Sequence, residues 1–229
     1  MTNAPFRPFE TEVDEGKALN LLEKACAGAE DGELFLERSK SEALVLDDGR
    51  VKTASFDTSQ GFGLRAVLGE VAGYAHSTEI SEAAMTRAVE TARLAVGAGG
   101  GTMAVGPKGT NTRLYEAIDP IESAGFSAKL DILKEIDAYA RALDPRVVQV
   151  TASVSATYQE VEILRVGGQR LTDVRPMTRL NVGVIVERDG RRDSGSAGGG
   201  GRAGLKGLLE PSNWAVPDTH LTLPTILCV

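Results

Sequence analysis

The chain has 229 residues, of which 42% are hydrophobic and 25% charged, and its formal net charge is -7. This length allows two modest domains or one large one. The acidic balance argues against a nucleic-acid-binding surface, and no apolar run approaches the about 20 residues of a membrane-spanning helix. An N-terminus without an apolar core, and Cys26 and Cys228 as the only cysteines, predict a cytoplasmic protein with reduced thiols.

The first half of the chain predicts a helix, then β-hairpins, then a second helix. Leu19, Leu22 and Cys26 are three and four residues apart, which predicts a helix over about 13–29 with Thr11 or Asp14 as its N-cap. Cys26 is interpreted as a small core residue of this helix. The predicted strands are 33–39, 42–46, 50–56, 63–68 and 71–75, with turns at Asp48-Gly49 and Gly69-Glu70. A helix from about 77–81 to Gly97, with Met85, Val89, Ala92 and Val96 on its buried face, leads into a linker over 97–109.

The second half repeats this order of parts. A helix is expected from an N-cap at Ser127 to Leu143, with Leu130, Leu133, Ile136, Ala140 and Leu143 on its buried face. Residues 150–158 alternate between apolar and polar side chains, which predicts a half-buried strand. Strands 161–166 and 169–174 then pair through Gly167-Gly168, and Asp189-Gly190 turns a further hairpin.

This repetition predicts an α+β fold of two related units, each an antiparallel sheet with packed helices. The expected divisions are an N-terminal domain over 1–105, a central domain over 106–214 and an atypical tail over 215–229.

Residues 181–202 combine a long hairpin with a run of glycines that ends at an arginine. Gly198, Gly199, Gly200, Gly201 and Arg202 have two interpretations. The favoured one is a flexible connection between domains. The other is backbone that lies against an extended peptide or a partner strand, where a side chain would block the approach. Arg191, Arg192 and Arg202 could bind carboxylates or could form a solvated edge.

The remaining motifs do not predict a catalytic, nucleotide-binding or metal-binding site. Gly61-x-Gly63-x-x-Ala66 fits a loose dinucleotide pattern, but Leu64 to Leu68 reads as a strand, whereas that motif opens a helix. A nucleotide-binding protein is therefore only a third interpretation. His76 and His220 are the only histidines, and they are too far apart in sequence to predict a zinc site with the two cysteines. No catalytic or metal-binding residue is predicted in this chain.

Three stretches together resemble the N-terminal half of the TldD/PmbA family of bacterial metallopeptidases. They are Q-G-F-G-L-R-A-V-L-G-E-V-A-G-Y-A-H-S-T (60–78), G-G-Q-R-L-T-D-V-R-P (167–176) and S-G-S-A-G-G-G-G-R-A (194–203). The resemblance covers about 10–214 and is closer to TldD than to PmbA. It implies a zinc peptidase of small or unfolded peptides that works as a homodimer, or as a heterodimer with a PmbA-like paralogue.

The resemblance places the zinc site of the family on a His-Glu-x-x-x-His helix and a later Cys in a C-terminal domain. This sequence has no such motif, and after Trp214 its composition shifts to Thr, Leu and Pro. We therefore expect a truncation or frameshift, with the catalytic domain absent and this chain inactive. The expected function is the substrate-enclosing and dimer-forming part of a TldD-like zinc metalloprotease. The alternative is a stand-alone peptide- or protein-binding module without enzymatic activity.

Overall fold

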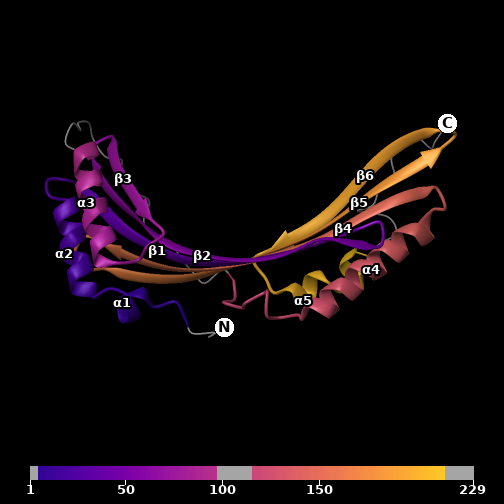
Figure 1. The fold of residues 1–229 in the computed structure, drawn as a ribbon, viewed down its shortest axis with the longest axis horizontal. Coiled ribbons are helices and arrows are strands. Elements are labelled where there is room, and N and C mark those ends of the chain that lie inside the picture. The colour runs from indigo at the N-terminus through magenta and orange to yellow at the C-terminus, as the bar shows by residue number, and fades with distance from the viewer. Residues whose placement is uncertain (1–4, 97–114, 215–229) are drawn as a thin grey trace. The chain divides into compact units, whose positions relative to one another are not determined.

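A computed structural model describes residues 5–96 and 115–214, and its strands form a six-stranded sheet in the order β3-β2-β1-β4-β5-β6 (Figure 1). The strands are β1 (Asp31–Asp47), β2 (Arg50–Leu68), β3 (Val71–Ser77), β4 (Val147–Arg165), β5 (Arg170–Arg188) and β6 (Arg191–Gly201). The helices are α1 (Pro8–Thr11), α2 (Glu15–Ala25), α3 (Glu82–Val96), α4 (Phe126–Leu143), α5 (Leu205–Leu208) and α6 (Pro211–Trp214). Within the described ranges, every helix lacks the length or the apolarity to cross a membrane.

The tight turns predicted from glycine are confirmed. Asp48 and Gly49 have φ values of 51° and 75°, and Asp189 and Gly190 have 52° and 75°. Two consecutive positive φ values are the signature of the type I′ hairpin turn, which matches the twist of the strands it joins. Positive φ also occurs at Gly69, Gly167 and Gly168. The turns join β1, β2 and β3 as neighbouring strands, and they join β4, β5 and β6 in the same way. This repeated order of three hairpin-linked strands agrees with the predicted repeat.

The predicted strands are too short. Residues 33–39 and 42–46 belong to one strand, β1, and 150–158 and 161–166 both belong to β4. The polar stretch from Ser39 to Ser41 interrupts the apolar alternation of β1, but the strand continues through it. A strand continues as long as its neighbours supply backbone hydrogen-bond partners, whatever its side chains.

The chain divides into two compact units, each built from three segments. Unit 1 contains 1–39, 58–112 and 159–174, and unit 2 contains 40–57, 113–158 and 175–229. By these bounds, β1, β2, β4 and β5 each contribute residues to both units. The predicted domain boundary at 105/106, the linker and the tail lie outside the described residues, so those predictions stay predictions.

In unit 1, helices α2 and α3 pack together, and α3 packs against β3. Asp14 is the N-cap of α2, as predicted, because its side chain accepts a hydrogen bond from the Lys17 N–H. The core joins both helices to β1 and β2 through Leu22, Leu34 and Met85, among others. Cys26 lies in this core as predicted, and burial, with a smaller effect of Asp31, raises its pKa to about 11.

In unit 2, α4 lies along one face of β4 and β5 (Figure 1). Val150, Ala152, Val154 and Ala156 are buried, which confirms the predicted alternation. Ser127 is not the N-cap: Gly125 takes that position with extended backbone, so the helix begins two residues earlier than predicted. The prediction for Leu143 is also wrong, because this last helical residue is 46% exposed.

Candidate functional site

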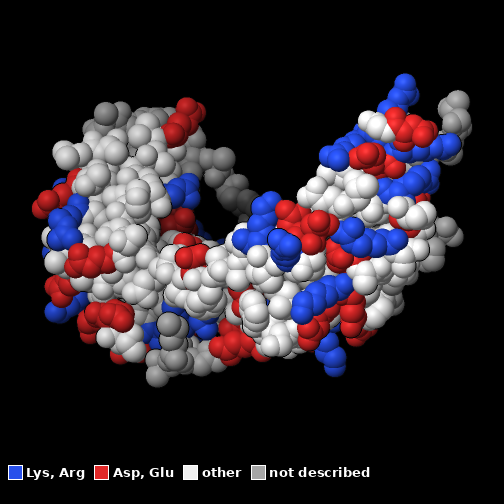
Figure 2. All heavy atoms as spheres, turned by 45° about the vertical axis from the view of Figure 1, so that its right-hand side comes forward, with Lys and Arg blue, Asp and Glu red and all other residues white. Residues whose placement is uncertain are grey.

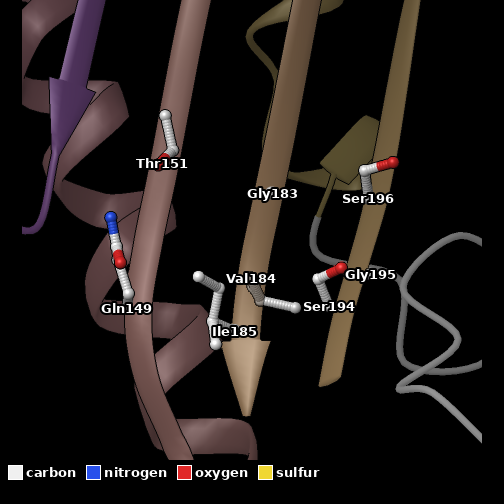
Figure 3. A pocket seen from close by; sticks show the side chains of 8 residues that line it. All are labelled: Gln149, Thr151, Gly183, Val184, Ile185, Ser194, Gly195 and Ser196. Atoms are coloured by element: carbon white, nitrogen blue, oxygen red, sulfur yellow. The ribbon is translucent and has the colours of Figure 1, made fainter. Parts of the chain in front are cut away.

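The strands of unit 2 carry a hollow of about 300 Å³ on the face that α4 does not cover (Figure 3). Its lining comes from β4, β5 and β6 and consists of Gln149, Thr151, Gly183, Val184, Ile185, Ser194, Gly195 and Ser196. Half-buried residues alternate along β5 with the buried Val182, Val184 and Val186 of the core. The hollow thus follows from the two-residue period of the strands, which sends alternate side chains to opposite faces.

Gly183 is the floor of the hollow. A Cβ atom placed there would meet only the Thr151 carbonyl oxygen, at 3.9 Å, so the space above the backbone is open. Gly183 pairs with Ser196 of β6, and its neighbour on the same face, Ile185, pairs with Ser194. Gly183 and Ser196 are therefore two small residues that face one another where larger side chains would close the face. A glycine inside a strand pattern often marks such a close approach.

Asp47 of β1 organises the β4 side of the hollow. Its Oδ1 accepts hydrogen bonds from Gln149 Nε2 at 2.9 Å and from Thr151 Oγ1 at 2.8 Å. Its Oδ2 lies 2.9 Å from Lys52 Nζ. The hydrogen bond from Gln149, and then those from Lys52 and Thr151, lower the Asp47 pKa to about 2. Asp47 is therefore an anion at neutral pH that fixes two side chains of the lining.

The glycine run forms the last part of β6, so its interpretation as a flexible connection is wrong. Gly198, Gly199, Gly200 and Gly201 pair in antiparallel register with residues 181, 180, 179 and 178 of β5. A Cβ atom at Gly198 would lie 2.6 Å from Asn181 Oδ1 and 2.7 Å from the Leu180 carbonyl oxygen. One at Gly200 would collide with the Thr178 carbonyl oxygen. Glycine is required at these two positions because the β5 backbone is so near.

β6 is an edge strand of the described sheet, and its residues 194–201 carry no charged side chain. Arg188 and Arg191 form the closing pair of the hairpin. Hydrogen-bonded and non-hydrogen-bonded pairs alternate from such a pair. The N–H groups of even-numbered β6 residues should therefore point to the free edge. Ser194 agrees with this pattern, since its N–H donates to Asp193 Oδ1 at 2.8 Å.

The arginines near the glycine run lie in exposed positions. The Arg202 guanidinium stacks 5.1 Å from the centre of the Tyr115 ring, and Arg192 Nε donates to Glu187 Oε2 at 2.6 Å. Figure 2 shows Lys and Arg interspersed with Asp and Glu on the face that it displays. The two interpretations of the arginines, as carboxylate ligands or as a solvated edge, stay predictions.

The nucleotide pattern lies in the wrong element for that function. Gly61, Gly63 and Ala66 are all inside β2, and no helix opens there. Tyr74 covers Gly63, because a Cβ atom at Gly63 would lie 2.7 Å from the Tyr74 hydroxyl oxygen. The glycines thus make room for a neighbouring side chain and for the Ser77 backbone rather than for a phosphate.

The histidine of the described residues is not part of a metal site. His76 stacks on Tyr74, with ring centres 5.8 Å apart. Among residues 5–96 and 115–214, no group of three or more His, Cys, Asp and Glu side chains could hold a metal ion. The residues of this part of the chain do not fit a metal centre. His220 lies outside the described residues.

Two family models match the chain. The one described as "PmbA/TldA metallopeptidase domain 1" covers residues 32–96, and "PmbA/TldA metallopeptidase central domain" covers 119–218. A "Metalloprotease TldD homolog" from Haemophilus influenzae is 37% identical over 182 residues, which are 78% of this chain and 38% of that protein. One from Buchnera aphidicola is 31% identical over 83% of this chain and 40% of its own length. The chain therefore spans about two fifths of the length of these curated relatives.

Solved structures share the fold at low sequence identity. A candidate modulator of DNA gyrase from Thermotoga maritima superposes with a TM-score of 0.66 and 17% identity, over 87% of this chain and 46% of that chain. TldE from Thermococcus kodakarensis gives 0.61 and 15%, over 86% of this chain and 46% of its own. These likenesses support the predicted α+β fold with its antiparallel sheet.

Sequence reasoning found the glycine run but missed the hollow. A signal was present, because Gly183 interrupts an otherwise β-branched strand and Thr151, Ser194 and Ser196 alternate along their strands. What the sequence did not contain was the order of the strands, which sets β4, β5 and β6 side by side. Asp47 could not be assigned to the site for the same reason.

Proposed function

Because the chain belongs to the PmbA/TldD metallopeptidase family, we propose that it forms the N-terminal, substrate-enclosing and dimer-forming part of a TldD-like zinc metalloprotease. The complete enzyme would hydrolyse small or unfolded peptides in the cytoplasm. This chain alone would bind such peptides without cutting them. Its partner would be a second copy or a PmbA-like paralogue.

The free edge of β6 supports this proposal most directly. Natural edge strands are commonly protected by charged residues, proline or bulges. Residues 194–201 contain no charged residue and no proline, and at Gly198 and Gly200 no side chain covers the backbone. Such an edge can accept an extended peptide as an added strand, with affinity from main-chain hydrogen bonds. Recognition through the main chain suits an enzyme that accepts unfolded peptides of varied sequence.

The alternative is a stand-alone binding module, which would use the same edge. The two proposals differ in what happens to a bound peptide when the rest of a metalloprotease is present. They agree that this chain binds extended peptides. Peptide binding is therefore the first property to test, and hydrolysis is the second.

The test uses the 229-residue chain and a fluorescent, unstructured peptide without charged side chains. Binding is measured by fluorescence anisotropy, and cleavage by mass spectrometry with and without added zinc. We expect saturable binding and an intact peptide under both conditions. Zinc-dependent cleavage by this chain would contradict its assignment as the non-catalytic part, and an absence of binding would contradict its role in holding substrates.

Ser196 offers a matched pair of variants for the edge. Ser196→Pro removes an N–H that should face the free edge, whereas Ser196→Ala keeps this N–H and removes only the hydroxyl. We expect peptide binding to be lost in Ser196→Pro and retained in Ser196→Ala. Equal binding by both variants would show that the edge of β6 does not hold the peptide. Circular dichroism of each variant checks that the sheet is intact.

A further inference from the structure

The first part of β2 is a second free edge of the sheet. β3 pairs with β2 only from Phe62 to Leu68, so among the described residues no strand pairs with 50–61 on that side. Residues 50–60 are all exposed, although side chains of a strand alternate between its two faces. The stretch 50–57 belongs to unit 2 and is called the β2 edge below. In the described sheet this edge has only β1 as a neighbour.

The hairpin fixes which main-chain groups of the β2 edge are unpaired. β1 and β2 are joined by the two-residue type I′ turn at Asp48-Gly49, so residues 47 and 50 close the hairpin. Hydrogen-bonded and non-hydrogen-bonded pairs alternate from this closing pair. The N–H and C=O groups of odd-numbered residues should therefore point away from β1. These residues are Val51, Thr53, Ser55 and Asp57.

The usual protection of an edge strand is weak at the β2 edge. Lysine on an edge strand commonly discourages pairing with another chain. Lys52, however, is drawn back over β1, because its Nζ lies 2.9 Å from Asp47 Oδ2. The edge contains no proline, and Val51 and Phe56 are 46% and 48% exposed. It thus offers unpaired main chain together with exposed apolar side chains.

The β2 edge is complementary to itself. We propose that it pairs antiparallel with the β2 edge of a second copy, with Thr53 on the two-fold axis, an inference that rests on the dimer-forming role in the proposed function. A two-fold axis normal to the sheet pairs odd-numbered residues with odd-numbered ones, so the unpaired main-chain groups of the two copies meet. The pairing spans 50–56 and ends before Phe62, where β3 begins to pair.

The side chains of this register agree with the pairing. Arg50 lies opposite the second copy's Phe56 in a non-hydrogen-bonded pair, where opposing side chains are closest. A guanidinium attracts the face of an aromatic ring, and the symmetry of the dimer makes this contact twice. No two like charges lie directly opposite each other. Because one strand from each copy forms a small interface, the dimer should be weak.

Sedimentation equilibrium of the 229-residue chain tests the pairing at micromolar to millimolar concentrations. A reductant is present, so that no disulfide through Cys228 links two copies. We expect a reversible equilibrium of monomer and dimer. Thr53→Pro removes the N–H at the centre of the pairing and should abolish the dimer, whereas Thr53→Ala keeps this N–H and should still dimerise. Circular dichroism of each variant checks that the sheet is intact.

Ser196→Pro is the matched control, because it makes the same kind of change at the opposite edge of the sheet. This variant should dimerise like the unaltered chain. Thr53→Pro, in turn, should keep the binding of the unstructured peptide that Ser196→Pro loses. The two proline variants thus separate self-association at β2 from peptide binding at β6.

A double-mutant cycle tests the register. Arg50→Ala and Phe56→Ala should each raise the dimer dissociation constant about tenfold, because each removes the contact twice. The double variant should be no weaker than either single variant. Additive effects would refute the pairing of Arg50 with Phe56.

Amide hydrogen exchange tests the edge without any substitution. Raising the concentration of the unaltered chain should increase protection at Val51, Thr53 and Ser55 and leave Lys52 and Ala54 unchanged. Equal protection of all five amides, or of none, in the dimer would refute the pairing.

The outcomes distinguish this inference from the proposed function. If Thr53→Pro dimerises like the unaltered chain, or if only Ser196→Pro disrupts the dimer, the β2 edge is refuted while the dimer-forming role stands. A monomer at every concentration would refute both the β2 edge and the pairing of two copies. Peptide binding is measured separately and is unaffected by either result.

Discussion

Arg170 Nη2 donates to Glu162 Oε1 at 2.7 Å, and the Glu162 side chain is completely buried. The same guanidinium contacts Glu15 Oε2 at 3.1 Å and stacks 5.3 Å from the centre of the Phe9 ring. Arg170 therefore ties the β4–β5 hairpin to the N-terminal helices of unit 1. Removing one partner of a buried ion pair leaves the other uncompensated, which costs more than the pair itself contributes.

Arg170→Met should lower the free energy of unfolding by about 3 kcal/mol, because it leaves the buried Glu162 carboxylate with only the longer ion pair to Arg7, at 3.5 Å. Urea denaturation measures this loss. Arg65→Met is the control, since Arg65 and its partner Glu33 are 51% and 35% exposed and their pair should contribute less than about 1 kcal/mol. The double variant with Glu162→Met should recover much of the loss. Equal effects of Arg170→Met and Arg65→Met would contradict this account.

Gly198 and Gly201 should respond differently to the same substitution. Gly198→Ala places a methyl group against Leu180 and Asn181 and should cost about 1–3 kcal/mol, as overpacked sites do. A Cβ atom at Gly201 meets nothing within 4 Å, so Gly201→Ala should change stability by less than about 0.5 kcal/mol. Thermal unfolding of both variants measures the difference. If Gly198→Ala left the thermal stability unchanged, β6 would not approach β5 as closely as described.

Asp47 should make the free energy of unfolding of unit 2 depend on pH in the acid range. Its hydrogen bonds from Gln149, Lys52 and Thr151 lower its folded-state pKa to about 2, below the ordinary value of about 3.9. The folded protein then binds the proton more weakly than the unfolded chain. The stabilisation is present above about pH 4 and is lost as the pH falls towards 2.

The measurement for Asp47 is the urea midpoint of the unaltered chain and of Asp47→Asn between pH 6 and pH 2. We expect the two midpoints to differ at pH 6 and to converge as the pH falls to 2. A constant difference over this range would contradict the lowered pKa.

Cys26 should react slowly with alkylating agents in the folded protein. Its thiol is buried and its pKa is raised to about 11, so the reactive thiolate is scarce at neutral pH. Peptide-level mass spectrometry after iodoacetamide treatment follows this residue separately from Cys228. Labelling should become fast in urea, where it should match a synthetic peptide of residues 20–32. Fast labelling without urea would mean that the core around Cys26 is open.

Local signals in the sequence predicted the turns and helices well. Asp48-Gly49 and Asp189-Gly190 form the expected hairpins, and Asp14 caps the expected helix. These features depend on a few adjacent residues, because positive φ and side-chain capping are decided within one turn of the chain. The antiparallel α+β class followed from the same hairpins.

Long-range features could not be predicted from such signals. Lys129 is 1% exposed on the core side of α4, where Nζ lies 2.6 Å from Glu42 Oε1, a residue 87 positions away. A lysine on a helix would ordinarily be placed on its solvated face. The pairing of Gly198–Gly201 with β5 and the approach of Asp47 to Thr151 also depend on strand order and register.

The central claim is that the free edge of β6 accepts an extended peptide, and amide hydrogen exchange tests it most directly. Exchange is followed by NMR in the 229-residue chain with and without a saturating unstructured peptide. The account predicts new protection at the even-numbered positions Ser196, Gly198 and Gly200, whose N–H groups should face the free edge, and little change at Ala197 and Gly199. Unchanged exchange at these three amides in the presence of bound peptide would contradict it.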